Sequence, residues 1–145
     1  MSALCNEQRI ENIRFAGNAQ NRFESMGKRK GGLSMDHMFT LTGTTLTVHL
    51  PSEVDHHSTE LLQREMDQLI QSRNIRCILF DFGDTVFMDS SGIGMLLGRY
   101  KMIRFVGGTM AAINVKERMR RVLLLSGVYK VIDIYEGLPQ QSKLL

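Results

Sequence analysis

The chain has 145 residues, 43% of them hydrophobic, and a formal net charge of +3. This length and apolar content are typical of a single globular domain with a substantial core. The sequence has no run of about 20 apolar residues and no secretory signal at its N-terminus, so neither a transmembrane helix nor export is predicted. We therefore expect a cytoplasmic protein that does not bind a membrane.

The basic residues are concentrated near the N-terminus. Of the chain's 18 Lys and Arg and 15 Asp and Glu, six basic and three acidic residues lie in residues 1–34, which leaves twelve of each in residues 35–145. A nucleic-acid-binding domain carries its positive charge on the folded part. Direct binding to nucleic acid is therefore not expected.

Residues 1–34 lack sustained apolar periodicity, which predicts a disordered tail. A basic tail that contacts acidic partners is a second interpretation. In a third, these residues are a translated leader and Met35 is the native start. Codons for residues 30–32, Lys-Gly-Gly, can contain the purine run AAGGAGG, and two codons separate them from Met35, as in a bacterial ribosome-binding site. A Gly31 codon other than GGA would exclude this interpretation.

Residues 35–136 are predicted to form the folded domain, followed by a polar tail over 137–145. Along this domain, β-forming runs alternate with helical periodicity. Strands are predicted over 39–42, 44–50, 77–82, 109–113 and 131–134, and helices over 56–73, 90–105 and 114–126. The order ββαβαβαβ is typical of an α/β domain with a mixed, largely parallel sheet packed against helices. The first two strands are expected to form a hairpin.

The most informative segment follows the predicted buried strand 77–82. A break at residues 83–85 ends the strand, and Asp89, Ser90 and Ser91 then provide good N-cap residues for the next helix. Hydroxyl groups are thus placed at a helix start, where side chains reach solvent and the first backbone N–H groups lack intrahelical partners. Such a place suits the attachment and removal of a phosphate, although on pattern alone the motif is usually only a helix cap.

The run Phe-Met-Asp-Ser-Ser-Gly-Ile-Gly from Phe87, with Leu-Leu-Gly-Arg-Tyr ending at Tyr100, resembles the signature of anti-sigma factor antagonists of the STAS fold. Residues 53–57 resemble the segment before the family's first helix, and the turns at 107–108 and 125–128 match later ones. The similarity runs from about residue 39 to 135 and is greatest to members that counter the anti-sigma factor of the sporulation factor sigma-F. The first 34 residues have no counterpart, and the short C-terminal tail leaves little room for the family's usual final helix.

The resemblance implies a binding module that has no catalysis or cofactor of its own and is monomeric when free. The unmodified protein would bind an anti-sigma factor that is also an ATP-dependent serine kinase, and so release a sigma factor. The kinase would then phosphorylate the first hydroxyl after the Asp, which is Ser90 here, and the antagonist would dissociate until a serine phosphatase resets it. Control of sporulation transcription is expected, with a general stress-response pathway as the alternative.

We expect the partner to contact the surface around Ser90. The expected contact residues are Asp55, His56, Asp84, Asp89, Ser91, Gly92 and Arg99. The resemblance places Asp55 at the partner surface, but Asp55 or Ser58 also suits the N-cap of the helix predicted from residue 56. Both roles are compatible.

Three glycines in the helix after Ser90 are expected to meet a geometric demand, because each costs roughly 1 kcal/mol relative to Ala in a helix. We expect Gly94 and Gly98 to allow the helix to pack closely onto the sheet, and Gly92 to allow the kinase to approach the helix backbone. Arg99 is expected on the solvated face, where it would contact an acidic surface of the partner.

Enzyme and metal alternatives receive less support. A serine hydrolase is an alternative, but the chain lacks Gly-x-Ser-x-Gly and its four His lie upstream of Ser90. A nucleotide-binding enzyme is another, but the glycine spacing from Gly92 misses the dinucleotide fingerprint by one residue. The neighbours His56 and His57 point apart on a helix and have no accompanying ligand cluster, so no metal site is predicted.

Overall fold

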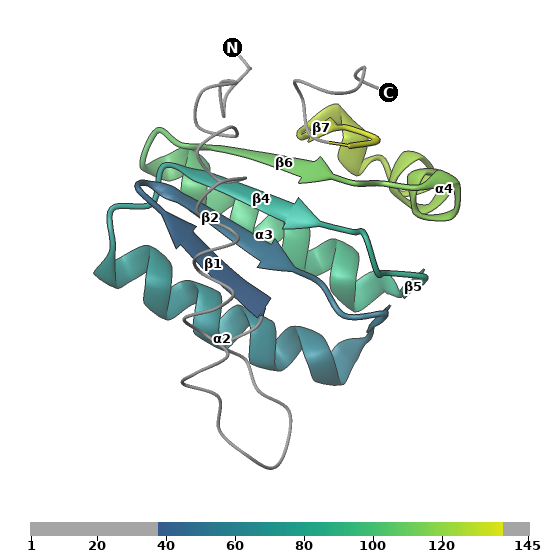
Figure 1. Cartoon of the computed structure of the whole chain (residues 1–145), viewed down its shortest axis with the longest axis horizontal. Helices are drawn as coiled ribbons and strands as arrows, with labels where there is room; N and C mark the ends of the chain where they lie inside the picture. The colour runs from purple at the N-terminus through teal and green to yellow at the C-terminus, as the bar shows by residue number, and fades with distance from the viewer. Residues whose placement is uncertain (1–37, 138–145) are drawn as a thin grey trace.

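The computed structural model describes residues 38–137, and Figure 1 shows their arrangement. The predicted tail 1–34, the proposed start at Met35 and nearly all of the tail 137–145 lie outside the described residues. The strands are β1 (Phe39–Thr42), β2 (Thr45–His49), β3 (Glu53–Val54), β4 (Cys77–Asp81), β5 (Phe87–Met88), β6 (Thr109–Ile113) and β7 (Asp133–Ile134). The helices are α2 (His56–Ser72), α3 (Ser90–Phe105), α4 (Glu117–Ser126) and the 3-10 helix η2 (Val128–Lys130).

Five strands form one mixed sheet in the order β1-β2-β4-β6-β7. β1 and β2 pair antiparallel from Phe39↔Val48 to Thr42↔Thr45, and Gly43 turns the chain between them with a φ of 60°. The other neighbours pair in parallel. The predicted hairpin, the largely parallel sheet and the α/β fold class are therefore confirmed.

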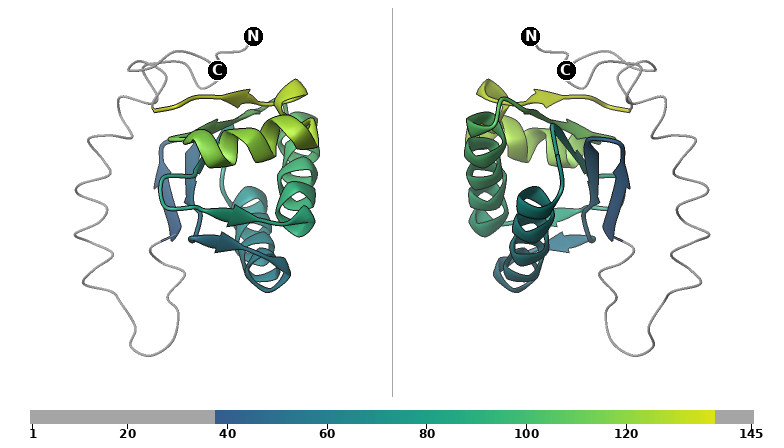
Figure 2. Two further views of the ribbon diagram at one scale, coloured as in Figure 1. Left: turned by 90° about the vertical axis from the view of Figure 1, so that its right-hand side faces the viewer. Right: turned by 90° about the vertical axis from the view of Figure 1, so that its left-hand side faces the viewer.

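Helices α2, α3 and α4 pack against one face of this sheet (Figure 2). Alternate residues of the strands, such as Leu46 and Val48 in β2 and Ile78 and Phe80 in β4, point into the shared core and are fully buried. The helices supply the other side of the core through Leu62, Met66, Met95, Leu96, Ile103, Met119 and Leu123. Burying a large apolar side chain stabilises the fold by roughly 1.5–3 kcal/mol, so this layer fixes the orientation of α3 and its first residue. Among residues 38–137 no helix is long and apolar enough to cross a membrane.

The third helix starts later than predicted. The sequence pattern indicates a helix from residue 114, but α4 begins at Glu117. Asn114 has a positive φ of 55°, and its side-chain amide donates to the Asp81 carboxylate at 2.9 Å. This bond to the end of β4, together with the left-handed backbone, keeps Asn114 outside the helix.

The C-terminal side of the domain has an exposed leucine and a shorter last strand than predicted. Leu125 is 89% exposed, because Met119 and Leu123 form the buried side of α4. The last strand is only Asp133–Ile134, since Val131 and Ile132 form a turn whose N–H groups donate to the Val128 carbonyl of η2. Gly127 ends α4 in the left-handed conformation, with a φ of 84°.

Candidate partner-binding site

Ser90 is the first residue of α3, and its side chain is exposed. It follows the two-residue strand β5, at the edge of the domain where β2, β4 and β6 end (Figure 1). The helix start predicted there is confirmed. The structure therefore satisfies the first requirement of a modification site, which is access from solvent.

Asp89 is the N-cap of α3. Its backbone is extended, and its Oδ1 accepts hydrogen bonds from the backbone N–H groups of Ser91 at 2.9 Å and Gly92 at 3.4 Å. A carboxylate at this position satisfies free N–H groups and interacts favourably with the helix dipole. Two of the N–H groups at the helix start are therefore already bonded to the Asp89 carboxylate.

The loop between β4 and α3 is held firmly on the segment before α2. The hydroxyl of Thr85 donates to the Pro51 carbonyl at 2.8 Å, and the N–H of Val86 donates to the Ser52 carbonyl at 2.8 Å. β5 then pairs with β3 in parallel, with Glu53 opposite Phe87 and Val54 opposite Met88. Neither short strand was predicted, although the two together fix the position of the loop that precedes Ser90.

This pairing brings Asp55 to the same surface. Asp55 is the N-cap of α2: its Oδ1 accepts from the Ser58 N–H at 3.0 Å, and the Ser58 hydroxyl accepts from the Asp55 N–H at 3.0 Å. The question of which residue caps the helix is thus answered by a reciprocal capping box. The hydrogen bond from the Ser58 N–H lowers the pKa of Asp55 below its ordinary value.

The surface around Ser90 is rich in carboxylates. Asp84 and Glu53 are exposed, and the caps Asp55 and Asp89 are half-buried. His56 is exposed as predicted, and its Nε2 lies 3.4 Å from a carboxylate oxygen of Glu60. A binding partner that meets this surface must accommodate its negative charge.

The packing around the glycines of α3 is the reverse of that predicted. A Cβ added to Gly92 would lie 2.5 Å from Met88 Cγ and 3.0 Å from Val54 Cγ1, so packing within the domain requires this glycine. At Gly94 and Gly98 an added Cβ would meet nothing within 4 Å. The close packing predicted for Gly94 and Gly98 is therefore wrong, and Gly92 is buried rather than open to backbone approach.

Arg99 is also not where the sequence placed it. The residue is 8% exposed, and its guanidinium donates to Gln63 Oε1 at 3.2 Å and lies 3.4 Å from the Asp67 carboxylate. Both partners are on α2, so Arg99 joins the two helices. The expectation of a solvated Arg99 is therefore wrong, because its guanidinium is buried against α2.

Two exposed apolar residues beside Ser90 were missed. Val86 is 49% exposed and Phe87 is 47% exposed, while Met88 points into the core. Alternation along β5 explains the exposure of Phe87, because Met88 faces inward and its strand neighbour therefore faces outward.

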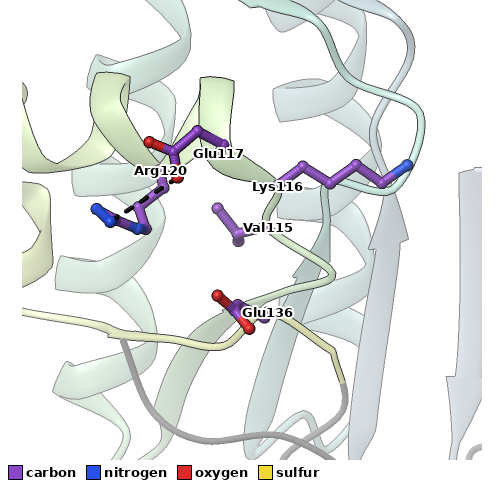
Figure 3. Close-up of a pocket in the computed structure, with 5 residues that line it drawn as sticks. All are labelled: Val115, Lys116, Glu117, Arg120 and Glu136. Atoms are coloured by element: carbon purple, nitrogen blue, oxygen red, sulfur yellow. Dashed lines mark ion pairs between the residues drawn. The ribbon is translucent and has the colours of Figure 1, made fainter.

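A polar hollow lies beyond the carboxyl end of β6, between α4 and the end of β7 (Figure 3). Its lining residues are Val115, Lys116, Glu117, Arg120 and Glu136. Glu117 and Arg120 pair at 3.8 Å, and the Lys116 ammonium donates to the Gly83 carbonyl at 3.0 Å. These charges are balanced within the hollow. Across residues 38–137 no three His, Cys, Asp or Glu side chains are grouped in a way that could hold a metal ion.

Residues 38–140 match the family model of the STAS domain. The chain belongs to the STAS family. The anti-sigma F factor antagonist of Paenibacillus polymyxa is 42% identical to it over 92 residues, which cover 63% of this chain and 79% of that protein. The anti-sigma-B factor antagonist of Bacillus subtilis is 31% identical over 90 residues, 61% of this chain and 80% of that one.

Solved structures agree with this STAS assignment. SpoIIAA in its unphosphorylated form has a TM-score of 0.58 and 26% identity, and the Bacillus SpoIIAA in its phosphorylated form has a TM-score of 0.58 and 28% identity. Each comparison covers 71% of this chain and 92% of the other. The resemblance seen around Ser90 is thereby confirmed: the chain is a STAS domain of the anti-sigma factor antagonist type, and its relatives are regulatory proteins.

Proposed function

We propose that this STAS domain binds an anti-sigma factor that is also a serine kinase, and that phosphorylation of Ser90 ends the binding. The observation that carries the proposal is the exposed Ser90 hydroxyl at the start of α3, on a surface shared with Asp55, His56 and Asp84. The similarity to a SpoIIAA solved in a phosphorylated form supports it. Ser91 and the Asp89 cap belong to the same contact surface.

The electrostatics of the helix start explain how a phosphate would act. A phosphoserine carries about −1.5 to −2 charge at neutral pH. Asp89 already accepts hydrogen bonds from two of the N–H groups that would otherwise receive the phosphate, and its carboxylate repels a second anion. The phosphate is therefore kept at the surface, where a partner would have to desolvate it beside Asp89. A loss of about 3 kcal/mol would weaken binding more than a hundredfold.

No conformational change in the STAS domain is needed for this switch. The loop before Ser90 is held by the β3–β5 pair, and α3 is fixed by its core residues. Charge alone, added at a fixed position, would decide between binding and release. A serine phosphatase would restore the binding form, and the free protein is proposed to be a cytoplasmic monomer without a cofactor.

Control of sporulation through sigma-F is the first choice of pathway. Its support is the 42% identity to an anti-sigma F factor antagonist, against 31% to an anti-sigma-B factor antagonist. A stress-response pathway is the second choice.

The proposal is tested by incubating the protein with ATP and the anti-sigma F factor of Paenibacillus polymyxa and mapping the phosphate by mass spectrometry. The wild type and Ser91→Ala should be labelled on Ser90, and Ser90→Ala should remain unlabelled. Phosphate on Ser91 or elsewhere, with Ser90 unmodified, would contradict the assignment of the site.

A further inference from the structure

We propose that Val86 and Phe87 are the apolar anchor of the partner interface, which inserts into an apolar depression of the anti-sigma factor bordered by Lys or Arg. This inference rests on the proposed function and adds the residues that supply the binding energy. Both side chains lie on the loop between β4 and α3, and Phe87 precedes Ser90 by three residues. Each exposes about half of its surface, at 49% and 47%.

The backbone of these two residues is fixed, although their side chains are exposed. The N–H groups of Val86 and Phe87 both donate to the Ser52 carbonyl, at 2.8 and 3.2 Å. Thr85 before them is bonded to the Pro51 carbonyl, and Met88 after them is 6% exposed and packed in the core. Apolar side chains held on a preorganised backbone lose little conformational entropy on binding, and aromatic residues are frequent among the residues that dominate binding energy.

The charges near this pair define the rim of the partner's depression. Asp84 and Asp89 belong to the same loop, and Glu53 lies opposite Phe87 in the β3–β5 pair. The ammonium of Lys116 bonds to the Gly83 carbonyl and contributes the opposite charge on the side of α4. A partner surface with an apolar centre and basic residues facing Glu53 and Asp89 complements this arrangement.

This geometry also accounts for the strength of the proposed switch. A basic rim alone would attract a phosphate, so charge attraction by itself would predict tighter binding after phosphorylation. A phosphate on Ser90 would instead lie at the margin of the apolar contact made by Phe87, where water must be removed from it. Burying an anion without full compensation costs far more than exposed pairing returns.

The molecule offers a matched control for this anchor. Phe105 is 91% exposed at the opposite end of α3, and it is an apolar residue of the same type. We would compare Phe87→Ser and Val86→Ser with Phe105→Ser in the full chain, measuring affinity for the anti-sigma F factor of Paenibacillus polymyxa by calorimetry. Phe87→Ser should weaken binding at least tenfold and Val86→Ser several-fold, whereas Phe105→Ser should bind like the wild type.

A second measurement does not depend on any variant being folded. Hydrogen exchange of the wild-type complex should show protection of residues 84–90 and none at residues 105–108.

If the wild type binds and Ser90→Asp abolishes binding, but Phe87→Ser binds like the wild type, the anchor is wrong while the proposed function holds. If the wild type neither binds this anti-sigma factor nor is phosphorylated by it, the proposed function is wrong and the anchor with it.

Discussion

Asp55 and Asp89 occupy matching positions: each directly follows one residue of the Val54–Met88 strand pair, and each caps the helix that begins after it. The short β3–β5 ladder thereby sets the starts of α2 and α3 side by side. The candidate surface is therefore built from two helix starts held in one register, with Ser90 at the second. Its shape depends on the two caps, and its negative charge comes from the cap carboxylates together with Glu53 and Asp84.

Replacing Asp89 separates its structural part from its charge. Asp89→Ala should lower the free energy of unfolding by about 1 kcal/mol, because α3 loses its N-cap. Asp89→Asn should lower the free energy of unfolding much less, since an amide oxygen can accept the same hydrogen bonds from the N–H groups of Ser91 and Gly92. Urea unfolding of both variants measures the difference. Equal destabilisation by Ala and Asn would show that the carboxylate charge, rather than the cap, stabilises the helix.

The glycines of α3 should respond to Ala with opposite signs. Gly92→Ala should destabilise the fold by about 1–3 kcal/mol, because its Cβ would overlap Met88 and press on Val54. The Cβ added by Gly94→Ala would meet nothing within 4 Å. This substitution should therefore stabilise the helix by up to about 1 kcal/mol. Thermal unfolding of the two variants decides the point. A stabilised Gly92→Ala would mean that Met88 moves aside at no cost.

Arg99 should matter for stability and not for direct contact with a partner. Arg99→Met removes the guanidinium that bonds Gln63 and pairs with Asp67. Leaving the half-buried Asp67 without this partner should cost about 1–3 kcal/mol of unfolding free energy. Affinity for the anti-sigma factor, measured where the variant is fully folded, should stay within about twofold of the wild type. A large loss of affinity in the folded variant would restore Arg99 to the interface.

Stability should fall on acidification through Asp81. Burial raises the pKa of Asp81, but hydrogen bonds from His49, Asn114 and the Gly83 N–H outweigh it, so that the pKa is lowered from its ordinary 3.8. A lowered folded-state pKa contributes stability above pH 3.8, and that contribution is lost as the pH falls through the folded-state pKa. Asp81→Asn should therefore be less stable than the wild type at pH 6, and the difference should shrink below pH 3.8. An unchanged difference across this range would contradict the assignment.

The features that could be predicted from the sequence are those that depend on local sequence patterns. The hairpin followed from β-forming residues around Gly43, and the start of α3 followed from the N-cap residues before an apolar helix face. β3 and β5 have two residues each, too few for any periodicity to show. They form only because distant segments pair.

Side-chain environments set by tertiary contacts were predicted least well. An Arg is exposed in most proteins, and the burial of Arg99 depends on Gln63 and Asp67 of another helix. The spacing of the glycines in α3 did not show which of them packs closely. The space beside Gly92 is limited by Met88 of β5 and Val54 of β3, which lie outside the helix. The exposure of Phe87 likewise depends on a tertiary contact, because pairing of β5 with β3 places Met88 in the core and leaves Phe87 outside it.

Substitution of the candidate switch should reproduce its two states in part. Ser90→Ala should bind the anti-sigma factor constitutively in the presence of ATP, because it cannot be phosphorylated. Ser90→Asp should bind poorly, since it places a carboxylate where the phosphate would lie. Ser91→Ala serves as the control at the neighbouring hydroxyl and should bind and release like the wild type. Equal binding by Ser90→Ala and Ser90→Asp would argue against an electrostatic switch.

The most direct test compares one protein in two covalent states. The wild-type chain, phosphorylated stoichiometrically by the kinase and purified, is titrated against the anti-sigma factor beside the unmodified chain under the same ionic conditions. We predict that phosphate on Ser90 weakens binding more than about a hundredfold while the melting temperature changes little. Equal affinity of the two forms, with Ser90 fully phosphorylated, would contradict this prediction.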